Sequence, residues 1–449
     1  MTRATVRGRS RVADVSQVYR LAWGKRQVRI PGSSRTSGTV PGITVRAVRD
    51  GIEIGRRAGY AGLTTLAGRL IYLEPPIDEF SFLALIAAAR GLDKVFRDSE
   101  RLPTRLVGER ADTILQLLAA LLIAQAERCV HRHIAQGYVT RSERLSILRG
   151  QPSFIRPQPP DGRWQCLYRT KETDILLNRL VLAGVEAASR WLRGTALERR
   201  NRMQRFIWRD IASLSLPERH HFATARRALT RQTDHYGPAL NLAEMLLFGL
   251  NASQRPQPAT ETLPLPLFDL NLLFEQFVAA VTRRLAASLG VTVDTQQHDY
   301  QALLDAKNDT YRPIRPDLVI RQGAIPIAVL DSKFKPQYMN YKGGTKHRVR
   351  TGDIYQVLFY AERTRRRANR AAAVPAAIVA PHLEGDNAPP VSQRIVRFIH
   401  GTEEARIDVI PLPLERAARA YHSGTADAIE AAVPHLHRFL ERAVTESRR

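Results

Sequence analysis

The stretch that decides the fold is Arg315-Pro-Asp317-Leu-Val-Ile-Arg-Gln-Gly-Ala-Ile-Pro-Ile-Ala-Val-Leu-Asp331-Ser-Lys333-Phe-Lys335. Two apolar runs flank a Gln-Gly turn signal, a pattern typical of a β-hairpin. The second run ends abruptly in Asp331 and Lys333, and period-two alternation places these two side chains on one face of the strand. Asp317 opens the first strand, so the hairpin register can bring its carboxylate beside Asp331.

This arrangement of charges at a strand end indicates a catalytic site. An apolar strand that ends in two ionisable groups is costly to bury unless something binds them. Two carboxylates repel each other unless a hard cation lies between them, and Mg²⁺ uses one or two carboxylates together with substrate phosphate oxygens. A neighbouring lysine can orient or deprotonate the attacking water, or offset phosphate charge. Asp317, Asp331 and Lys333 therefore favour phosphodiester hydrolysis over the alternative, an ordinary salt bridge at a strand end.

Two other features support this interpretation. Gln356 and Tyr360 lie four residues apart on a predicted helix and share one face, where Gln356 could hold a water or phosphate and Tyr360 could support it. The alternative for this pair is an interhelical hydrogen bond beside an aromatic core residue. Upstream, Glu275 lies in a mainly apolar helix and is a candidate third metal ligand, the alternative being a surface glutamate.

The composition suggests a polyanionic partner. The chain of 449 residues has 68 Lys and Arg against 43 Asp and Glu, a net charge of +25. Such an excess favours nucleic acid, although an arginine-rich genome would produce the same bias. Two cysteines cannot build a disulfide framework, and neither a secretion signal nor a membrane-spanning run of about 20 apolar residues is found. We expect a cytoplasmic protein without a membrane partner.

The chain around the hairpin predicts a mixed α+β protein of several parts. A helix is expected over 270–288 with Asp269 as its N-cap, and Gly137–Arg149 is expected to be a turn with an amphipathic piece. The main boundary is placed in the proline-rich segment Asn251–Pro266. The predicted parts are a flexible basic lead-in (1–40), a small β-rich and helical module (41–125), a mainly helical middle region (126–260) and a catalytic domain (261–449).

Taken together, these motifs resemble the PD-(D/E)XK nuclease superfamily in its RecB-like form and, more narrowly, the McrC family of McrBC-type restriction systems. The likeness extends upstream, where Glu172 and Asp174 begin a helix that carries Asn178 and Arg179. We interpret the two acids as structural, and Asn178 and Arg179 as packing or partner contacts. The matching stretches are Gly137-Tyr-Val, Leu148-Arg-Gly150, Glu172-Thr-Asp174-Ile-Leu-Leu-Asn178-Arg179, Leu273-Phe-Glu275-Gln-Phe, Arg315-Pro-Asp317, Asp331-Ser-Lys333-Phe and Ile354-Tyr-Gln356-Val-Leu-Phe-Tyr360.

The resemblance implies a C-terminal PD-(D/E)XK domain, a mixed sheet flanked by helices, that cuts DNA with Mg²⁺. It implies a metal held by Glu275, Asp317, Asp331 and the backbone carbonyl of Ser332. It also implies a partner, a ring-forming McrB-like AAA+ GTPase bound by residues 126–260, which agrees with the absence of a G-x-x-x-x-G-K-[ST] loop in this chain. The alternatives are a stand-alone or RecB-like repair nuclease and a nuclease-inactive DNA-binding adaptor of an AAA+ ring.

Overall fold

The computed structural model describes most of the chain, and its ranges are as follows: 18–21, 27–31, 43–48, 51–56, 59–66, 69–92, 113–152, 163–248, 267–296, 299–338 (apart from 301, 304, 306, 308 and 312), 349–368, 373–383, 392–399 and 402–447. The basic lead-in lies largely outside these residues, and the proline-rich boundary segment lies wholly outside them. The chain divides into two compact units, one formed by 1–101, 250–254 and 267–449 and the other by 102–249 and 255–266.

The first unit contains a six-stranded mixed sheet in the order β11-β12-β13-β14-β16-β15. Its middle is parallel, because β13 pairs with β14 and β14 with β16 in parallel, while the remaining pairs are antiparallel. The strands are β11 (Thr292–Thr295), β12 (Leu318–Gln322), β13 (Ile325–Ser332), β14 (Ala376–His382), β15 (Gln393–Ile399) and β16 (Thr402–Pro413). The predicted hairpin is thus confirmed as β12 and β13.

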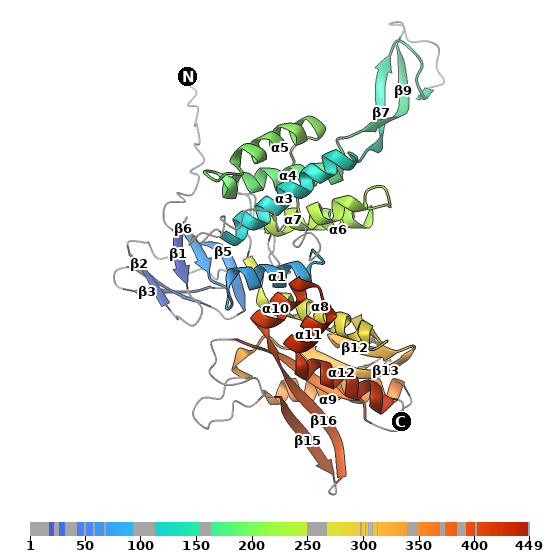
Figure 1. Cartoon of the computed structure of the whole chain (residues 1–449). Coiled ribbons are helices and arrows are strands. Elements are labelled where there is room, and N and C mark those ends of the chain that lie inside the picture. The colour runs from blue at the N-terminus through green and yellow to red at the C-terminus, as the bar shows by residue number, and fades with distance from the viewer. Residues whose placement is uncertain are drawn as a thin grey trace. The chain divides into compact units, whose positions relative to one another are not determined.

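Helices cover both faces of this sheet (Figure 1). Helix α9 packs on one face, where Val357 and Ala361 join a core with Ile378 and Val409. Asp408, which alternates with Val409 on β16, is bound from the other face by Arg442 of α12. The helices are α8 (Leu270–Ser288), α9 (Thr351–Arg367), α10 (Leu414–Ser423), α11 (Ala426–Ala432) and α12 (Pro434–Ser447), with a short 3-10 turn, η3 (Pro336–Tyr338).

The N-terminal strands belong to the same unit. They form a four-stranded sheet, β1-β6-β5-β10, and a three-stranded sheet, β2-β4-β3. Strand β10, which leads into α8, pairs antiparallel with β5, and α1 packs against α8 and α10. The elements are β1 (Val18–Leu21), β2 (Gln27–Pro31), β3 (Ile43–Val48), β4 (Gly51–Arg56), β5 (Tyr60–Leu66), β6 (Arg69–Leu73), α1 (Glu79–Ala89) and β10 (Leu267–Asp269).

The second unit is a group of helices from which an antiparallel arm projects (Figure 1). The arm pairs β7 with β9 over nine residues each, and β8 adds a short third strand. The elements are α3 (Thr113–Arg132), β7 (Gly137–Leu145), β8 (Gln151–Pro152), β9 (Trp164–Glu172), α4 (Leu176–Leu192), α5 (Glu198–Ile211), α6 (Arg219–Arg227), η2 (Asp234–Tyr236) and α7 (Gly237–Phe248). In the described part of the chain, every helix is too short or too polar to cross a membrane.

The structure corrects two expectations. The predicted boundary between 125 and 126 falls inside α3, and the β-rich module shares a unit with the C-terminal sheet because β5 pairs with β10. Most of the stretch 137–149 is the long strand β7 rather than a turn with an amphipathic piece, since β9 supplies the partner backbone. By contrast, Asp269 caps α8 as predicted, its carboxylate accepting hydrogen bonds from Asn271 N and Leu272 N.

Candidate active site

The predicted acidic residues gather at one edge of the six-stranded sheet. Because β11, β12 and β13 are antiparallel neighbours, the end of β11, the start of β12 and the end of β13 share this edge. Asp317 immediately precedes β12, and Asp331 is the penultimate residue of β13. Asp331 pairs in register with Ile378, a core residue beneath α9, so its side chain lies on the face that α9 covers.

Asp331 is a fully buried carboxylate with one cationic neighbour. Its Oδ2 lies 2.6 Å from Lys333 Nζ, while its Oδ1 has no partner among the described residues. Burial, helped by the nearby charge of Asp317 and opposed by Lys333, raises the pKa of Asp331 to about 7. Burial would lower the pKa of Lys333, but the charge of Asp331 outweighs it and the pKa rises. Lys333 is therefore an ammonium at neutral pH, and the charge of Asp331 is only partly compensated.

The other two acids are each held by a different donor. Asp317 Oδ2 accepts hydrogen bonds from the backbone N of Ser332 (2.8 Å) and from its hydroxyl (2.7 Å), which fixes Asp317 to the end of β13. Glu275, on α8, accepts a hydrogen bond from the side chain of Gln296. Burial and the charge of Asp317 raise the pKa of Glu275. For both Glu275 and Asp331, burial is the main cause of the raised pKa, and the charge of Asp317 adds to it.

The structure brings the acids into electrostatic range without joining them into a finished metal site. Among the described residues, no three acidic, histidine or cysteine side chains converge as a metal-binding group. Each carboxylate contacts a different donor, Asp317 the backbone and hydroxyl of Ser332, Asp331 the ammonium of Lys333 and Glu275 the side chain of Gln296. The chemistry of the donors nevertheless fits a hard cation: the predicted ligands Glu275, Asp317, Asp331 and Ser332 offer oxygen atoms, and one buried carboxylate oxygen of Asp331 lacks a partner.

Gln356 and Tyr360 lie on α9 and contact each other as predicted. Gln356 Nε2 donates to the Tyr360 hydroxyl at 2.7 Å, and the Tyr360 side chain packs against Val329 and Val374. Val329 lies two residues before Asp331 on the same face of β13, so Gln356 and Tyr360 are on the same side of the sheet as Asp331. The described contacts tie Gln356 to Tyr360, and a role in holding water or phosphate stays a prediction.

Sequence reasoning missed a second polar network beside the acids. Asp353, in the first turn of α9, accepts hydrogen bonds from Lys335 Nζ and from the Tyr338 hydroxyl, and that hydroxyl also accepts from Arg350 N at 3.1 Å. Although burial acts in the opposite direction, these donors lower the pKa of Asp353. The network ties the segment after Lys333 to the start of α9. Five of the chain's eight lysines lie between 307 and 346, and this excess is the one feature of the sequence that points here.

Gln296 was also missed, and nothing in its polar surroundings distinguishes it in the sequence. It follows β11 with a φ of 51°, in the left-handed region that non-glycine residues rarely adopt. Its backbone N donates to the carbonyl of Asp317 at 3.0 Å while its side chain reaches Glu275. Gln296 therefore links α8 to the start of β12, at the cost of local strain.

Comparison with known proteins identifies the family. The profile described as "McrBC 5-methylcytosine restriction system component" matches residues 83–372, well over half of the chain. The chain therefore belongs to the McrBC family of restriction system components, and the resemblance drawn from its motifs is confirmed. A search among curated proteins finds no match.

Solved structures agree at the level of the fold. A chain of the refined half-complex from the tetradecameric assembly of Thermococcus gammatolerans McrB AAA+ hexamers with bound McrC superposes with a TM-score of 0.53 and 19% sequence identity, over 89% of this chain and 85% of that chain. The cryo-EM structure of the Thermococcus gammatolerans McrBC complex gives a TM-score of 0.42 and 21% identity, over 60% of this chain and 88% of that chain. At this identity, the first match supports a shared mixed α+β fold.

Proposed function

We propose that this protein is the Mg²⁺-dependent DNA endonuclease subunit of a McrBC-like, modification-dependent restriction system, with a catalytic domain of the PD-(D/E)XK type. The proposal rests on one observation: Asp317, Asp331 and Lys333 lie together at one edge of the sheet, beside Glu275. There, a buried carboxylate with an unpartnered oxygen lies beside a protonated lysine. Such a site gains stability from a divalent cation, and the net charge of +25 suits a DNA substrate.

The side chains have separable tasks in this proposal. Asp317, Asp331 and Glu275, with the carbonyl of Ser332, would hold Mg²⁺, which supplies Lewis-acid stabilisation of the phosphate and a more acidic water. Lys333 keeps its ammonium group next to Asp331 and offsets charge that develops on the phosphate. The hydroxyl of Ser332 holds Asp317 in position, because it donates to the Asp317 carboxylate. Gln356 is steadied by Tyr360 and is the side chain proposed to hold water or phosphate.

We propose an AAA+ hexamer of the McrB type as the partner, because the fold matches a chain from an assembly of McrB hexamers with bound McrC. The arm of the second unit, β7 to β9, is the candidate contact. It projects from the helices and carries large apolar side chains that are exposed, including Tyr138 (71%), Ile147 (77%) and Leu148 (56%). Exposed apolar side chains that gather on one projecting element are typical of a protein contact.

The base of this arm is fixed to the helices by a buried polar network. Asn178 Nδ2 donates to the carbonyls of Ala135 (2.8 Å) and Thr173 (2.6 Å), residues that flank the two ends of the arm. Its Oδ1 accepts from the hydroxyl of Tyr236 at 2.7 Å, and that hydroxyl accepts from Ala135 N at 3.0 Å. Asn178 and Tyr236 are both fully buried, so the base is held by a satisfied network, and of the two roles predicted for Asn178, packing or partner contact, these bonds fit packing.

The test is cleavage of methylated DNA by the purified chain with its cognate AAA+ protein and nucleotide, comparing wild type with Asp331→Asn. We expect cleavage by the wild type in Mg²⁺, none in EDTA, and a loss of at least about a thousandfold in the variant, because a metal-binding carboxylate is removed. Stimulation of the partner's nucleotide hydrolysis should persist in the variant. Undiminished cleavage by Asp331→Asn would overturn the assignment of the site, and cleavage without any partner would favour a stand-alone nuclease.

A further inference from the structure

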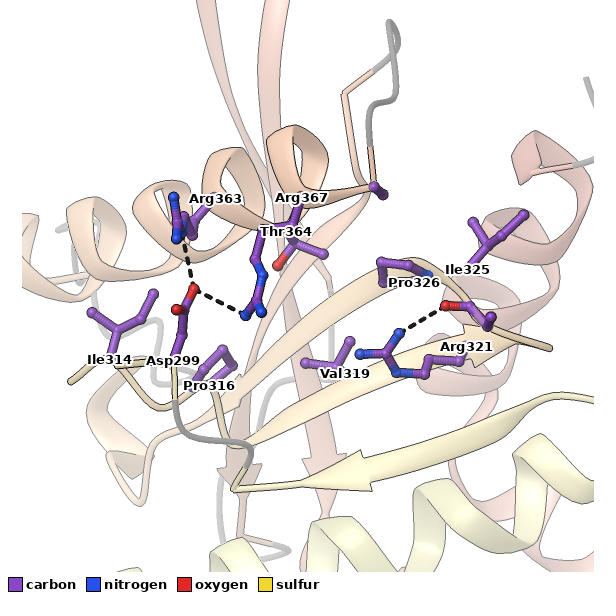
Figure 2. Close-up of a pocket in the computed structure, with 12 residues that line it drawn as sticks. Asp299, Ile314, Pro316, Val319, Arg321, Ile325, Pro326, Arg363, Thr364 and Arg367 are labelled. Atoms are coloured by element: carbon purple, nitrogen blue, oxygen red, sulfur yellow. Dashed lines mark hydrogen bonds and ion pairs between the residues drawn. The ribbon is translucent and has the colours of Figure 1, made fainter. Parts of the chain in front are cut away.

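A cavity of about 400 Å³ lies between the β12–β13 hairpin and the C-terminal half of α9 (Figure 2). Its apolar wall comes from Ile314, Pro316, Val319 and Pro326, and its other side carries guanidinium groups. The volume is that of a pocket for a ligand of nucleotide size. None of the residues assigned above to the metal or to catalysis lines this cavity.

Arginines make the cavity cationic. Arg363 Nε lies 2.9 Å and Arg367 Nη1 3.2 Å from Asp299 Oδ2, so one nearly buried carboxylate orients two guanidinium groups (Figure 2). Arg321 lies across the cavity, where it pairs with Asp294 and donates to the carbonyl of Ala324 at 2.9 Å. Each guanidinium has five N–H donors in a planar fork that suits phosphate oxygens. The Arg367 side chain is 53% exposed and can therefore accept an anion without first being uncovered.

The cavity adjoins the candidate active site. Ile314 lines the cavity and also packs against the apolar cluster that contains Tyr360, so the two sites have this side chain between them. Gln356, Tyr360 and Thr364 follow one another at four-residue spacing on one face of α9, and Thr364 lies in the cavity. From Gln356 to Thr364 the helix rises about 12 Å. That distance corresponds to about three or four nucleotides of a strand at about 3.4 Å each.

We propose that this cavity is a subsite for one nucleotide of the DNA strand, a few positions from the phosphate to be cleaved. Arg367 and Arg363 bind the phosphate, and the apolar wall of Ile314, Pro316 and Val319 receives the sugar or base. The proposal rests on the proposed nuclease function. A free nucleotide offers the same chemistry, but the position of Ile314 between the two sites and the common face of α9 favour a unit of the strand that also crosses the active site.

The test uses full-length protein with Asp331→Asn, so that DNA binding is measured without cleavage. Fluorescence anisotropy follows a labelled duplex and its single strand over a range of salt concentrations, in EDTA. Arg367→Ala is compared with Arg366→Ala, which removes the same charge from the same helix turn but from a side chain that pairs with Glu362 and lies outside the cavity. Thr364→Trp fills the cavity without changing charge. Thermal unfolding confirms that each variant is folded.

We expect Arg367→Ala to weaken binding roughly fivefold to tenfold and to reduce the salt slope by about 0.7 to 0.9, the loss of one phosphate contact. Arg366→Ala should change affinity by less than about twofold, and Thr364→Trp should weaken binding at every salt concentration. Equal effects of the two arginine variants would overturn the subsite. Binding of thymidine monophosphate that depends on Arg367 but leaves the affinity for the oligonucleotide unchanged would show that the cavity holds a free nucleotide and not a unit of the strand. Failure of wild-type cleavage would instead count against the nuclease.

Discussion

Replacing Asp331 with Asn should stabilise the metal-free protein although it abolishes the proposed activity. The native carboxyl has a pKa raised from 3.8 to about 7, mainly by burial. Between these two values the native state therefore binds more protons than the unfolded chain does. The free energy of unfolding falls as pH rises through this window. Above about pH 7 the buried carboxyl is ionised, and the loss of stability reaches its full size. Asparagine has no proton to lose, so the variant escapes this penalty.

The size of the effect follows from the same shift. At about 1.4 kcal/mol per pKa unit, the wild type is less stable than the variant by at most about 4 kcal/mol at pH 8. This figure already contains the attraction of Lys333, which lies 2.6 Å from the carboxylate. Because local water entry softens such penalties, we expect about 2 to 4 kcal/mol at pH 8 and a gap close to zero near pH 4. Mg²⁺ at about 100 times its Kd should raise the free energy of unfolding of the wild type by about 2.7 kcal/mol and leave that of the variant unchanged.

Calorimetry of both proteins from pH 4 to 8.5, in EDTA and in Mg²⁺, measures these differences. The two units need not unfold together, so the transition that responds to Asp331→Asn is assigned to the first unit. Asp408→Asn is a matched control: this acid is also buried in the sheet, but Arg442 and Arg406 pair with it. Its variant should lose stability. A destabilised Asp331→Asn at pH 8 in EDTA, or equal stabilisation of both proteins by Mg²⁺, would refute the reasoning.

Other predictions address the site and the arrangement of units. Lys333→Arg should reduce cleavage at least about a hundredfold in a DNA-cutting assay, because a planar fork cannot replace a compact ammonium that is only 20% exposed. Tyr360→Phe should lower the cleavage rate only a few fold, since it removes one hydrogen-bond partner of Gln356. A fragment of 261–449 should fail to give cooperative unfolding, because β10 and α8 lose their contacts with β5 and α1, while 102–249 should unfold cooperatively. Asn178→Ala should destabilise the latter fragment by about 1 to 3 kcal/mol in urea titrations, because it removes a donor to the carbonyls of Ala135 and Thr173 and the acceptor of the Tyr236 hydroxyl.

The local sequence was sufficient to predict the β12–β13 hairpin and the N-cap of α8. Strand β13 is a continuous apolar run that begins at Ile325 and ends in charge, so its presence was predictable. It ends at Ser332, one residue before Lys333, which had been placed on the strand. The α8 cap at Asp269 and the contact of Gln356 with Tyr360 were predictable because both depend on residues four or fewer positions apart. Short-range interactions can therefore be predicted from a single sequence.

What the sequence could not reveal depends on partners far along the chain. Strand β7 is polar and largely exposed on both faces, so its pattern resembles a loop, and only its pairing with β9 makes it a strand. The β-rich module was wrongly separated from the C-terminal sheet, because β5 and β10 pair although the whole second unit lies between them in the sequence. The backbone of Gln296 is left-handed and its side chain contacts Glu275. Glutamine has no preference for this conformation, so the contact could not be predicted from the residue type. Each case is decided by tertiary contacts.

The pairing of β5 with β10 has a consequence for synthesis on the ribosome. Tyr60 on β5 can pair with Asp269 on β10 only after Asp269 has been synthesised. At about 5 to 20 residues per second, the roughly 200 residues between them take some 10 to 40 s to be translated. The second unit lies wholly within that interval and can complete its folding first. During the delay the edge of β5 lacks its neighbour, and an exposed strand edge invites aggregation. Slow translation across the inserted unit would therefore threaten the yield of this protein more than slow translation near either end.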